Sequence, residues 1–352
     1  MKNDIMLKML DTTVLEGKAK KQWTAVFVCA IVLFSICCLE ILNVKYDSLA
    51  RYPYEDENSR KLIRQYLSEE EIEYIIEYSI PPNMFIAYIQ EDGFSIYHAA
   101  EYKKLSESQW DKSPAMIVKM VEETRNLMTT DQLASYLAPG NYKYEDIQYY
   151  IQNEMDEDCS LIAYAMNTDA YPDAAHTLST RKPSLQYLSE EIPTKDGVIL
   201  EVNEALQQPL LSLCGGITST LSDAHACGGL QIETGYVSHT KQKRAYEEAM
   251  ESYGEKAGLY VSKPGHDEHQ LGLAVDFSVE GLSDEEFEKT IQYQWLKENA
   301  WKYGFMETWN VDDEALTEHQ AEPYHYRYIG TDLAKTIHDS GLSFARYKAQ
   351  IK

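Results

Sequence analysis

The longest apolar run of the chain lies near its N-terminus. Residues 23–39, WTAVFVCAIVLFSICCL, carry no charge, and Ile41, Leu42 and Val44 continue the run beyond Glu40. A helix of about 20 apolar residues is long enough to cross a bilayer. The pattern therefore predicts a single membrane-spanning helix over 23–44.

Three lysines just before this run predict its orientation. Lys18, Lys20 and Lys21 should stay inside by the positive-inside rule, so we expect residues 1–22 to form a cytoplasmic tail. The chain from about residue 45 onward would then lie outside the cell membrane. A cleaved signal peptide is the alternative. The long preceding segment and the lack of a small-residue A-x-A site favour a retained anchor.

Helical patterns dominate residues 45–180, which we expect to form a mainly helical extracytoplasmic region. After a polar stalk at 45–60, the stretch LSEEEIEYIIEY (67–78) places apolar residues at helical spacing behind a serine suited to capping. Residues 113–128 and 142–155 predict two further helices. No group of residues here is typical of a catalytic site, so a stalk or a surface that binds a protein partner is the plain interpretation.

The pattern changes near residue 180. Residues 165–195 have loop composition, and 197–203 (GVILEVN) predict a strand. Residues 229–259 predict a strand, a turn and a helix that begins after Ser238 and ends at Gly254.

Large apolar residues alternate strictly with small or polar residues in the stretch LGLAVDFS. Leu271, Leu273, Val275 and Phe277 fall on one face of the predicted strand, and Gly272, Ala274, Asp276 and Ser278 fall on the other. The second face is small and polar, as the floor of a cleft should be. It carries one carboxylate, that of Asp276.

Composition excludes one class of function. The 352 residues are 44% apolar, enough for a sizeable core, and 57 acidic against 32 basic residues give a formal net charge of -25. A nucleic-acid-binding surface needs basic residues to meet the phosphates, so we expect no nucleic-acid partner.

The cysteines outside the apolar run leave two interpretations open. Cys214 and Cys227 lie in the similar contexts CGG and ACGG, so a disulfide between them is possible in an extracellular setting. Two buried thiols are the alternative. Cys159 is left over in either case.

Four residues form a candidate zinc site. His269 can converge with Asp276 if the chain turns at Gly272, and His325 lies on a later strand-like stretch. Two imidazoles and one carboxylate suit Zn²⁺ with an open position for water. Glu322, held extended by the proline after it, lies close to His325 and can accept a proton from that water.

Three motifs around these residues resemble a known family. The chain has T-G-Y-V-S-x3-Q at 234–242, P-G-H-D-E-H-Q-L-G-L-A-V-D at 264–276 and E-P-Y-H-Y-R-Y at 322–328. VanY-type D-alanyl-D-alanine carboxypeptidases, zinc peptidases of the bacterial cell wall, carry S-G-Y-R-S-x3-Q, P-G-x-S-x-H-x2-G-x-A-x-D and E-P-W-H-Y-R-Y in the same order. The resemblance covers about residues 180–352.

The resemblance implies a fold and a set of roles. Residues 181–352 would form the small α+β zinc domain shared by Hedgehog-like proteins and D-Ala-D-Ala peptidases. His269, Asp276 and His325 would bind Zn²⁺, and Glu322 would be the catalytic base. The substrates would be peptidoglycan stem peptides. Substrate-binding roles fall on Ser238, Gln242, Asp267 and Arg327.

Two departures from the family pattern concern the substrate carboxylate. Val237 replaces the family arginine that is taken to hold the developing oxyanion, and Asp267 replaces a serine that helps to bind the terminal carboxylate. Losing an oxyanion donor costs about 2.7–4 kcal/mol elsewhere. Arg327, Lys241 or Arg244 are candidate substitutes.

These changes keep several functions open. The primary expectation is D,D-carboxypeptidase-like, zinc-dependent hydrolysis. A wall endopeptidase or an L,D-carboxypeptidase with altered carboxylate recognition is the alternative, and so is a peptidoglycan-binding module without turnover. Three further histidines have no role in the motifs: we expect His266 to be a second-shell or surface residue and His239 and His319 to be bystanders.

Overall fold

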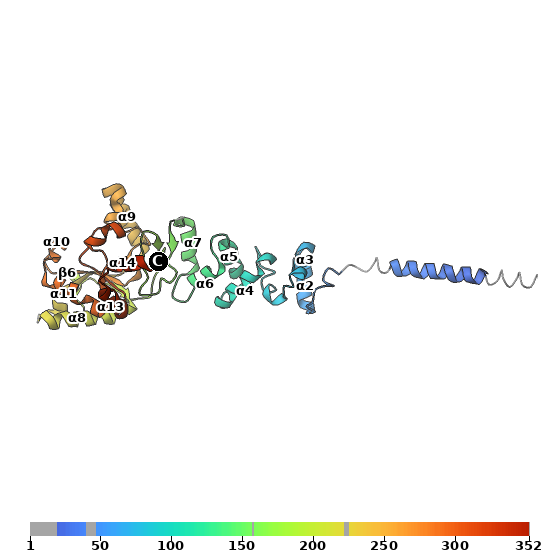
Figure 1. Cartoon of the computed structure of the whole chain (residues 1–352), viewed down its shortest axis with the longest axis horizontal. Coiled ribbons are helices and arrows are strands. Elements are labelled where there is room, and N and C mark those ends of the chain that lie inside the picture. Colours follow the sequence, from blue (N-terminus) through green and yellow to red (C-terminus); the bar gives the residue numbers. More distant parts are fainter. Residues whose placement is uncertain (1–19, 40–46, 157, 222–224, 352) are drawn as a thin grey trace, which may run out of the picture. The chain divides into compact units, whose positions relative to one another are not determined.

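The computed structural model describes residues 20–39, 47–156, 158–221 and 225–351. The chain forms two compact units, one within Met1–Ala100 and one within Glu101–Lys352 (Figure 1). The sequence places the start of the peptidase domain later, at 181, and that functional boundary stays a prediction.

The first unit includes the apolar helix Lys20–Leu39. Among the described residues it is the one helix long and apolar enough to cross a membrane, and a signal sequence would have the same properties. Residues 1–19 and 40–44 of the predicted tail and anchor lie outside the described residues.

The rest of the first unit is a small helical body. Helices α2 (Glu57–Tyr66) and α3 (Glu69–Glu77) pack around a shared apolar core, and Ser68 caps α3 in a capping box, as the sequence predicts. The polar stalk predicted for 45–60 is wrong in part. Leu49 and Tyr52 are buried in this core, because two apolar residues suffice to bring an otherwise polar stretch onto it.

Helices surround the second unit. Helix α4 (Ala99–Ser108) runs across the division between the units. The others are α5 (Pro114–Thr124), α6 (Thr130–Tyr136), α7 (Tyr144–Asn153), α8 (Gln207–Leu221), α9 (His239–Tyr253), α10 (Asp284–Phe287), α11 (Ile291–Asn299), α12 (Glu314–Thr317), α13 (Thr331–Ser340) and α14 (Phe344–Gln350). Helices α5, α7 and α9 confirm three predicted helices, and Ser238 and Gly254 cap the two ends of α9.

Three small sheets complete the second unit. The strands are β1 (Ser160–Leu161), β2 (His176–Thr177), β3 (Leu185–Tyr187), β4 (Glu201–Asn203), β5 (Leu230–Thr234), β6 (Ala274–Val279), β7 (Phe305–Glu307) and β8 (His325–Tyr328). Strands β1 and β2 pair in parallel, β3 and β4 pair antiparallel, and the central antiparallel sheet has the order β5-β6-β8-β7. The predicted α+β mixture is confirmed; the Hedgehog-like assignment stays a prediction.

Two strand expectations need correction. Residues 165–195, expected to be loop, contain β2 and β3. The strand expected at 197–203 shortens to β4, because Asp196 and Gly197 take positive φ and turn the chain just before it.

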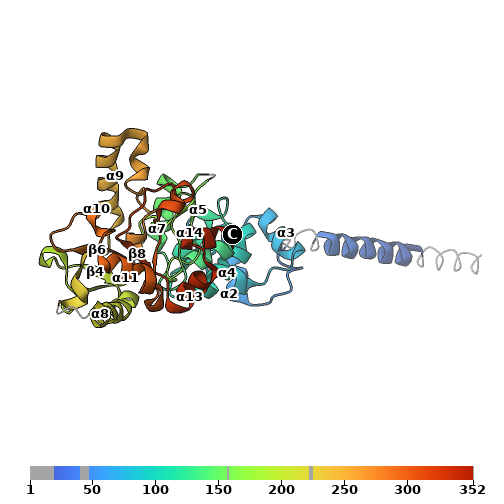
Figure 2. The same cartoon turned by 60° about the vertical axis from the view of Figure 1, so that its left-hand side comes forward.

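The main core lies against one face of the central sheet. Val275 and Phe277 of β6 pack with Leu210 and Leu213 of α8 and with Leu296 of α11. In Figure 1, α8, α11 and α13 lie on one side of β6 and α9 projects on the other, and Figure 2 shows the same arrangement. The opposite face of β6, which carries Asp276, is therefore left for a site.

The segment 179–181 connects the helical part of the second unit to the turn before β6. Arg181 is buried and donates to the carbonyl of Asn141 at 3.0 Å. Gln270 donates through Nε2 to the carbonyl of Ser179 at 2.6 Å. These buried hydrogen bonds hold the turn that contains His269 against the helices before residue 180.

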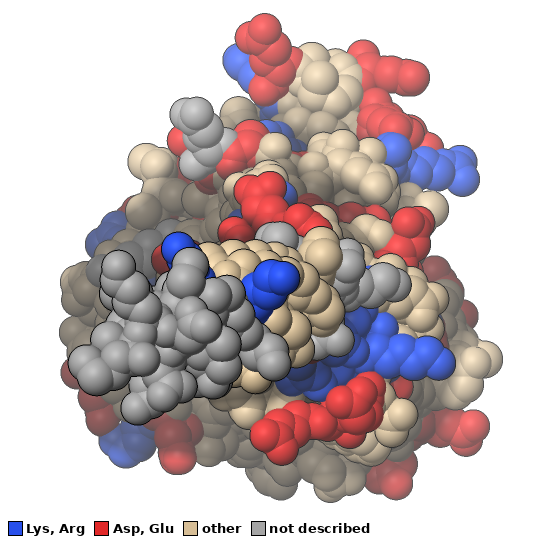
Figure 3. Space-filling view, turned by 90° about the vertical axis from the view of Figure 1, so that its right-hand side faces the viewer, with Lys and Arg blue, Asp and Glu red and all other residues tan. Residues whose placement is uncertain are grey.

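Charge is mixed on the surface. In Figure 3 acidic and basic side chains are interspersed over most of the face that is drawn, with one group of adjacent basic side chains to the right of its centre. The absence of a nucleic-acid partner stays a prediction from composition.

A disulfide joins Cys214 of α8 to Cys227 before β5, so the first of the two interpretations of these cysteines is confirmed. The bond closes a sequence separation of 13 residues and fastens α8 to the edge of the central sheet. Cys159 remains a free thiol.

We predict that the variant Cys214→Ala/Cys227→Ala is less stable by about 3 kcal/mol, because the crosslink restricts the unfolded chain. This corresponds to a fall of about 6–12 °C in the midpoint of the thermal transition of the second unit, measured by calorimetry. Cys159→Ala is the matched control and should unfold close to the wild-type temperature. An unchanged midpoint in the double variant would contradict the stabilising role of the disulfide.

Candidate metal centre

Strand pairing brings two of the four predicted residues together. Asp276 lies directly opposite His325 in the antiparallel ladder between β6 and β8. Side chains at directly opposed positions project from the same face of a sheet. The register between these two strands therefore places the carboxylate beside the imidazole.

A tight turn brings the third residue. His269 lies in the one-turn 3-10 helix Glu268–Leu271, whose first backbone N–H groups are capped by the side chain of Asp267. Gly272 ends this turn with φ +67, and a Cβ there would lie 2.8 Å from the backbone nitrogen of Asn203. A glycine is therefore required at this turn, which reverses the chain so that His269 faces Asp276, as the sequence predicts.

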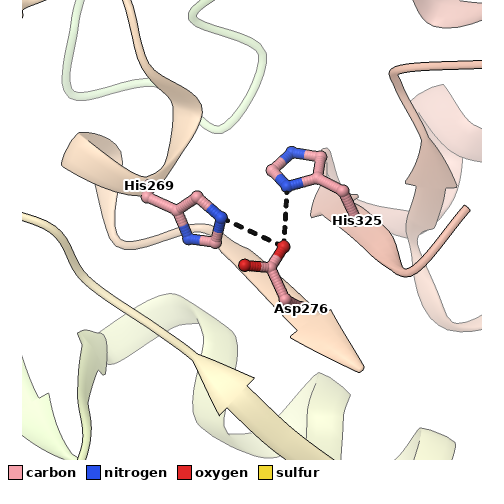
Figure 4. Close-up of side chains that lie close together, drawn as sticks. All are labelled: His269, Asp276 and His325. Atoms are coloured by element: carbon pink, nitrogen blue, oxygen red, sulfur yellow. Dashed lines mark hydrogen bonds and ion pairs between the residues drawn. The ribbon is translucent and has the colours of Figure 1, made fainter. Parts of the chain in front are cut away.

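The three side chains converge around one carboxylate oxygen (Figure 4). His269 Nε2 lies 3.2 Å and His325 Nδ1 lies 3.0 Å from Asp276 Oδ1. One ligand atom from each of the three residues lies within 4.8 Å of the others. This set of two imidazoles and one carboxylate can hold a metal ion.

Outer partners orient both imidazoles. The Nδ1 of His269 donates to the carbonyl of Gly235 at 2.8 Å, and the Nε2 of His325 donates to Glu268 Oε2 at 3.0 Å. The other nitrogen of each ring is thereby the one that faces Asp276. Such outer hydrogen bonds are typical of metal-bound histidines, since they fix the ring and its tautomer.

Glu268 is a site residue that the sequence interpretation missed. Its side chain is buried, and Oε2 also accepts from Thr308 Oγ1 at 2.6 Å. Burial opposes its ionisation, but the hydrogen bond from His325 and the charge of Arg327 lower the pKa of Glu268. The available signal was its position: an acid next to His269 inside the P-G-H-D-E-H motif.

Trp309 was missed as well. Its ring stacks on His325 with a centroid distance of 4.0 Å, and His319 stacks on the same indole at 4.0 Å. The aromatic contact fixes the plane of the His325 ring, so His319 supports the site indirectly rather than standing apart from it.

Without an ion, protons hold the cluster together. Burial opposes the charge of Asp276, but the imidazoles of His269 and His325 outweigh it and hold the pKa of Asp276 well below its usual range. Burial also lowers the pKa of His325, yet its hydrogen bonds to Asp276 and Glu268 prevail and raise it to about 10. The raised pKa of His325 favours a proton on the nitrogen that faces Asp276, and the pKa of His269 is shifted in the same direction.

Glu322 lies three residues before the start of β8. Its backbone N–H donates to the carbonyl of Trp309 at 2.8 Å, and its own carbonyl accepts from the N–H of His325 at 3.0 Å. Burial raises the pKa of the Glu322 carboxyl to about 8, and the charges of Asp276 and Asp267 add to the rise. The role of Glu322 as the catalytic base stays a prediction.

The four predicted substrate-binding residues have structural contacts in the metal-free chain. Ser238 caps α9 through Lys241 N, and Gln242 is buried and donates to the carbonyl of Ser262 at 2.8 Å. Asp267 is buried and accepts from the N–H of His269 at 2.8 Å. Their roles toward a substrate stay predictions.

Arg327 is the fourth of these residues and is fully buried. Its Nε donates to the carbonyl of Tyr328, and its Nη2 donates to the carbonyls of Thr168 and Ala170. The guanidinium thus holds a loop of the preceding region against β8. Two of its three hydrogen bonds join the loop, and the third is made to Tyr328 within β8.

Val237 stands where the family has an arginine, and the other candidates to replace that positive charge, Lys241 and Arg244, lie on α9. Val237 itself is buried, and its N–H donates to the carbonyl of His269 at 3.2 Å. Lys241 and Arg244 are exposed, and Arg244 forms an ion pair with Glu248 at 3.0 Å. None of these contacts directs a cation to the three ligands.

Two of the three further histidines also have defined contacts. His266 Nδ1 donates to the carbonyl of Asp173 at 2.6 Å, which anchors the P-G-H turn. His239 Nε2 lies 3.2 Å from Glu154 Oε1 and joins the start of α9 to the end of α7. Both are structural contacts at a distance from the three-ligand cluster.

Comparisons with known proteins agree with the predicted resemblance. Residues 219–331 match the family model described as VanY: D-alanyl-D-alanine carboxypeptidase. This segment contains His269, Asp276, Glu322 and His325. The resemblance to VanY-type carboxypeptidases is therefore confirmed.

Individual relatives match part of the chain. It is 32% identical over 176 residues to the putative carboxypeptidase YodJ of Bacillus subtilis, covering 48% of this chain and 60% of YodJ. It is 34% identical over 139 residues to a D-alanyl-D-alanine carboxypeptidase of Enterococcus faecalis, covering 36% of this chain and 51% of the relative. The chain thus spans about half of these relatives' length.

One solved structure is similar in fold. It is described as the structure of the LdcB LD-carboxypeptidase that reveals the molecular basis of peptidoglycan recognition. It is 28% identical, with a TM-score of 0.51, and the match covers 56% of this chain and 94% of that one.

We predict that zinc binds this site more tightly as the pH rises from 6 to 8. The metal must displace protons from His325, whose pKa is about 10, and from His269, whose pKa is also raised. Calorimetric titrations in buffers of different ionisation enthalpy should show proton release at pH 7. A zinc affinity independent of pH over this range would contradict the proton-held cluster.

We also predict that Glu268→Gln weakens zinc binding about 10–100-fold, because the amide removes the charge behind His325. Competition with a chromogenic chelator measures the change. Glu285→Gln, at an exposed position of α10, is the matched control and should bind zinc as the wild type does. Equal affinities in the two variants would show that Glu268 does not support the centre.

Proposed function

We propose that the chain is a zinc-dependent peptidase that hydrolyses peptide bonds in the stem peptides of peptidoglycan. The observation that carries the proposal is the convergence of His269, Asp276 and His325 within 4.8 Å. The three lie inside the segment that matches the VanY family model, with Glu322 three residues before the last ligand.

The donor set fits zinc. Two nitrogen donors and one carboxylate, each imidazole held by an outer acceptor, form a ligand set that catalytic zinc sites use. Zinc bound there would supply Lewis acidity to the scissile carbonyl and lower the pKa of water.

Glu322 supplies the proton transfer. A general base must be ionised, and in the metal-free chain burial keeps this carboxyl protonated up to a pKa of about 8. His269, Asp276 and His325 would hold a divalent cation, whose positive charge would favour the ionised form of a neighbouring carboxyl such as that of Glu322. Glu322 then takes a proton from water and delivers it to the leaving amine.

The family match supports D,D-carboxypeptidase-like cleavage as the first assignment. The similarity to the LdcB LD-carboxypeptidase favours an L,D-carboxypeptidase as the second. Two residues bear on this choice, because a carboxypeptidase must bind a terminal carboxylate. Val237 is apolar and buried, and the guanidinium of Arg327 donates to backbone carbonyls. An endopeptidase, which needs no terminal-carboxylate site, is therefore a third assignment.

The helix Lys20–Leu39 supports a location at the cell membrane. We propose that it anchors the chain in a single pass, with residues from about 45 onward outside, where peptidoglycan lies. The helices before residue 180 would then act as a spacer or as a surface for a protein partner.

We predict that Glu322→Gln lowers turnover of a cleavable muropeptide about 10²–10⁴-fold, the usual contribution of a general base. Zinc content should stay at the wild-type level, because Glu322 is not one of the three ligands. The full chain, loaded with zinc, is incubated with defined muropeptides, and the products are weighed by mass spectrometry.

The products distinguish the assignments. Loss of D-Ala from a pentapeptide means a D,D-carboxypeptidase, and loss from a tetrapeptide means an L,D-carboxypeptidase. Opened cross-links mean an endopeptidase. Full turnover by Glu322→Gln would contradict the role of Glu322 as the base. If the zinc-loaded wild type leaves every substrate intact, the peptidase proposal is wrong and a peptidoglycan-binding module without turnover is favoured.

A further inference from the structure

A cavity lies on the face of β8 opposite to the metal centre. Successive strand residues point to opposite faces, so His325 and Tyr326 project in opposite directions. The cavity has a volume of about 420 Å³, and its lining includes Tyr293 and Leu296 of α11, Phe305 and Glu307 of β7, Tyr326 of β8 and Pro323. Helix α11 lies on this side of the sheet in both views (Figures 1 and 2).

One residue of the cavity lining has a buried polar group without a partner among the described residues. Tyr326 is 1% exposed, and within the described parts of the chain no group hydrogen-bonds to its hydroxyl. Burying a hydroxyl without a partner costs about 1–3 kcal/mol. A group of this kind next to a cavity is suited to a ligand that supplies the missing hydrogen bond.

A carboxylate lies beside that hydroxyl. Glu307 is directly opposite Tyr326 in the ladder between β7 and β8, so the two side chains share a face. Tyr293 Oη lies 3.5 Å from Glu307 Oε1, which completes a cluster of one carboxylate and two phenols. Burial raises the pKa of Glu307 to about 7, and the charge of Lys297 offsets this only in part.

The charge of the lining is negative. Four carboxylates and two cations line the cavity: Glu288, Glu307, Asp312, Asp313, Lys297 and Arg346. Arg346 is already engaged, since it pairs with Asp313 at 2.7 Å and donates to the carbonyl of Asp312. Lys297 is exposed at the mouth, with Nζ 5.3 Å from the centre of the Tyr293 ring.

We propose that this cavity binds a small organic cation, an alkylammonium group, with its charge at Glu307 and the hydroxyl of Tyr326. The carboxylate and the phenol oxygen accept from the ammonium, and the ring of Tyr293 adds a cation–π contact. Met306 and Val311, which line the cavity and keep accessible surface, contact the alkyl part. The Lys297 ammonium lies over the same Tyr293 ring, and the ligand displaces it.

This site is separate from the proposed catalytic function. Ala321 and Pro323, which flank Glu322 in sequence, form part of the cavity wall, so the two sites are on either side of one segment. None of the three metal ligands lines the cavity. Binding can therefore be measured without zinc and without turnover.

The test is a ligand-observed NMR titration of the full chain in nanodiscs with pentylammonium, with 1-pentanol as the neutral probe of the same size. We expect saturable binding of pentylammonium only. Glu307→Gln should weaken it at least tenfold, and Lys297→Met should strengthen it several-fold by removing the competing charge. Glu285→Gln, an exposed acid outside the cavity, should leave the affinity unchanged.

Tyr326→Phe is the second variant, because it keeps the ring and removes the unpartnered hydroxyl. It should fold at least as stably as the wild type, because the unpartnered hydroxyl is gone, and bind pentylammonium several-fold more weakly. Equal binding of the two probes, an unchanged affinity in Glu307→Gln, or no saturable binding to the wild type would overturn the proposal.

Discussion

The register between β6 and β8 is the constraint on which the candidate centre depends. It sets Asp276 directly opposite His325 on the face away from the main core. A shift by one residue would turn every side chain of the strand to the other face. The register is specified because Val275, Phe277 and Tyr326 fill the apolar core on the reverse face. The core thus determines where the ligands lie.

The centre is also under electrostatic stress in the absence of a metal. Two imidazoles and the carboxylates of Asp276 and Glu268 are buried together, and burying charge is costly unless it is paired. Protons on the imidazoles supply the pairing in the metal-free chain. Under the proposed function, a divalent ion would replace these protons at the same atoms.

The sequence predicts the parts of the site that depend on local patterns. Gly272 as the turn, Ser238 as the helix cap and the alternation around Asp276 can all be inferred from a few neighbouring residues, and the structure has each of them. Glu268 and Trp309 could not be assigned in this way. Their roles arise from contacts that the fold makes between separate elements. Trp309 stacks on His325, 16 positions later, and Glu268 contacts Thr308 and His325, which lie 40 and 57 positions later.

The account's central claim is that the three side chains bind one zinc ion, and X-ray absorption at the zinc edge of the full chain tests it most directly. We expect one zinc per chain, with two imidazole nitrogens and a carboxylate oxygen at about 2.0–2.2 Å. This signal should vanish in His269→Ala. A chain that stays free of zinc, or a zinc ion that keeps its ligands in that variant, would contradict the assignment.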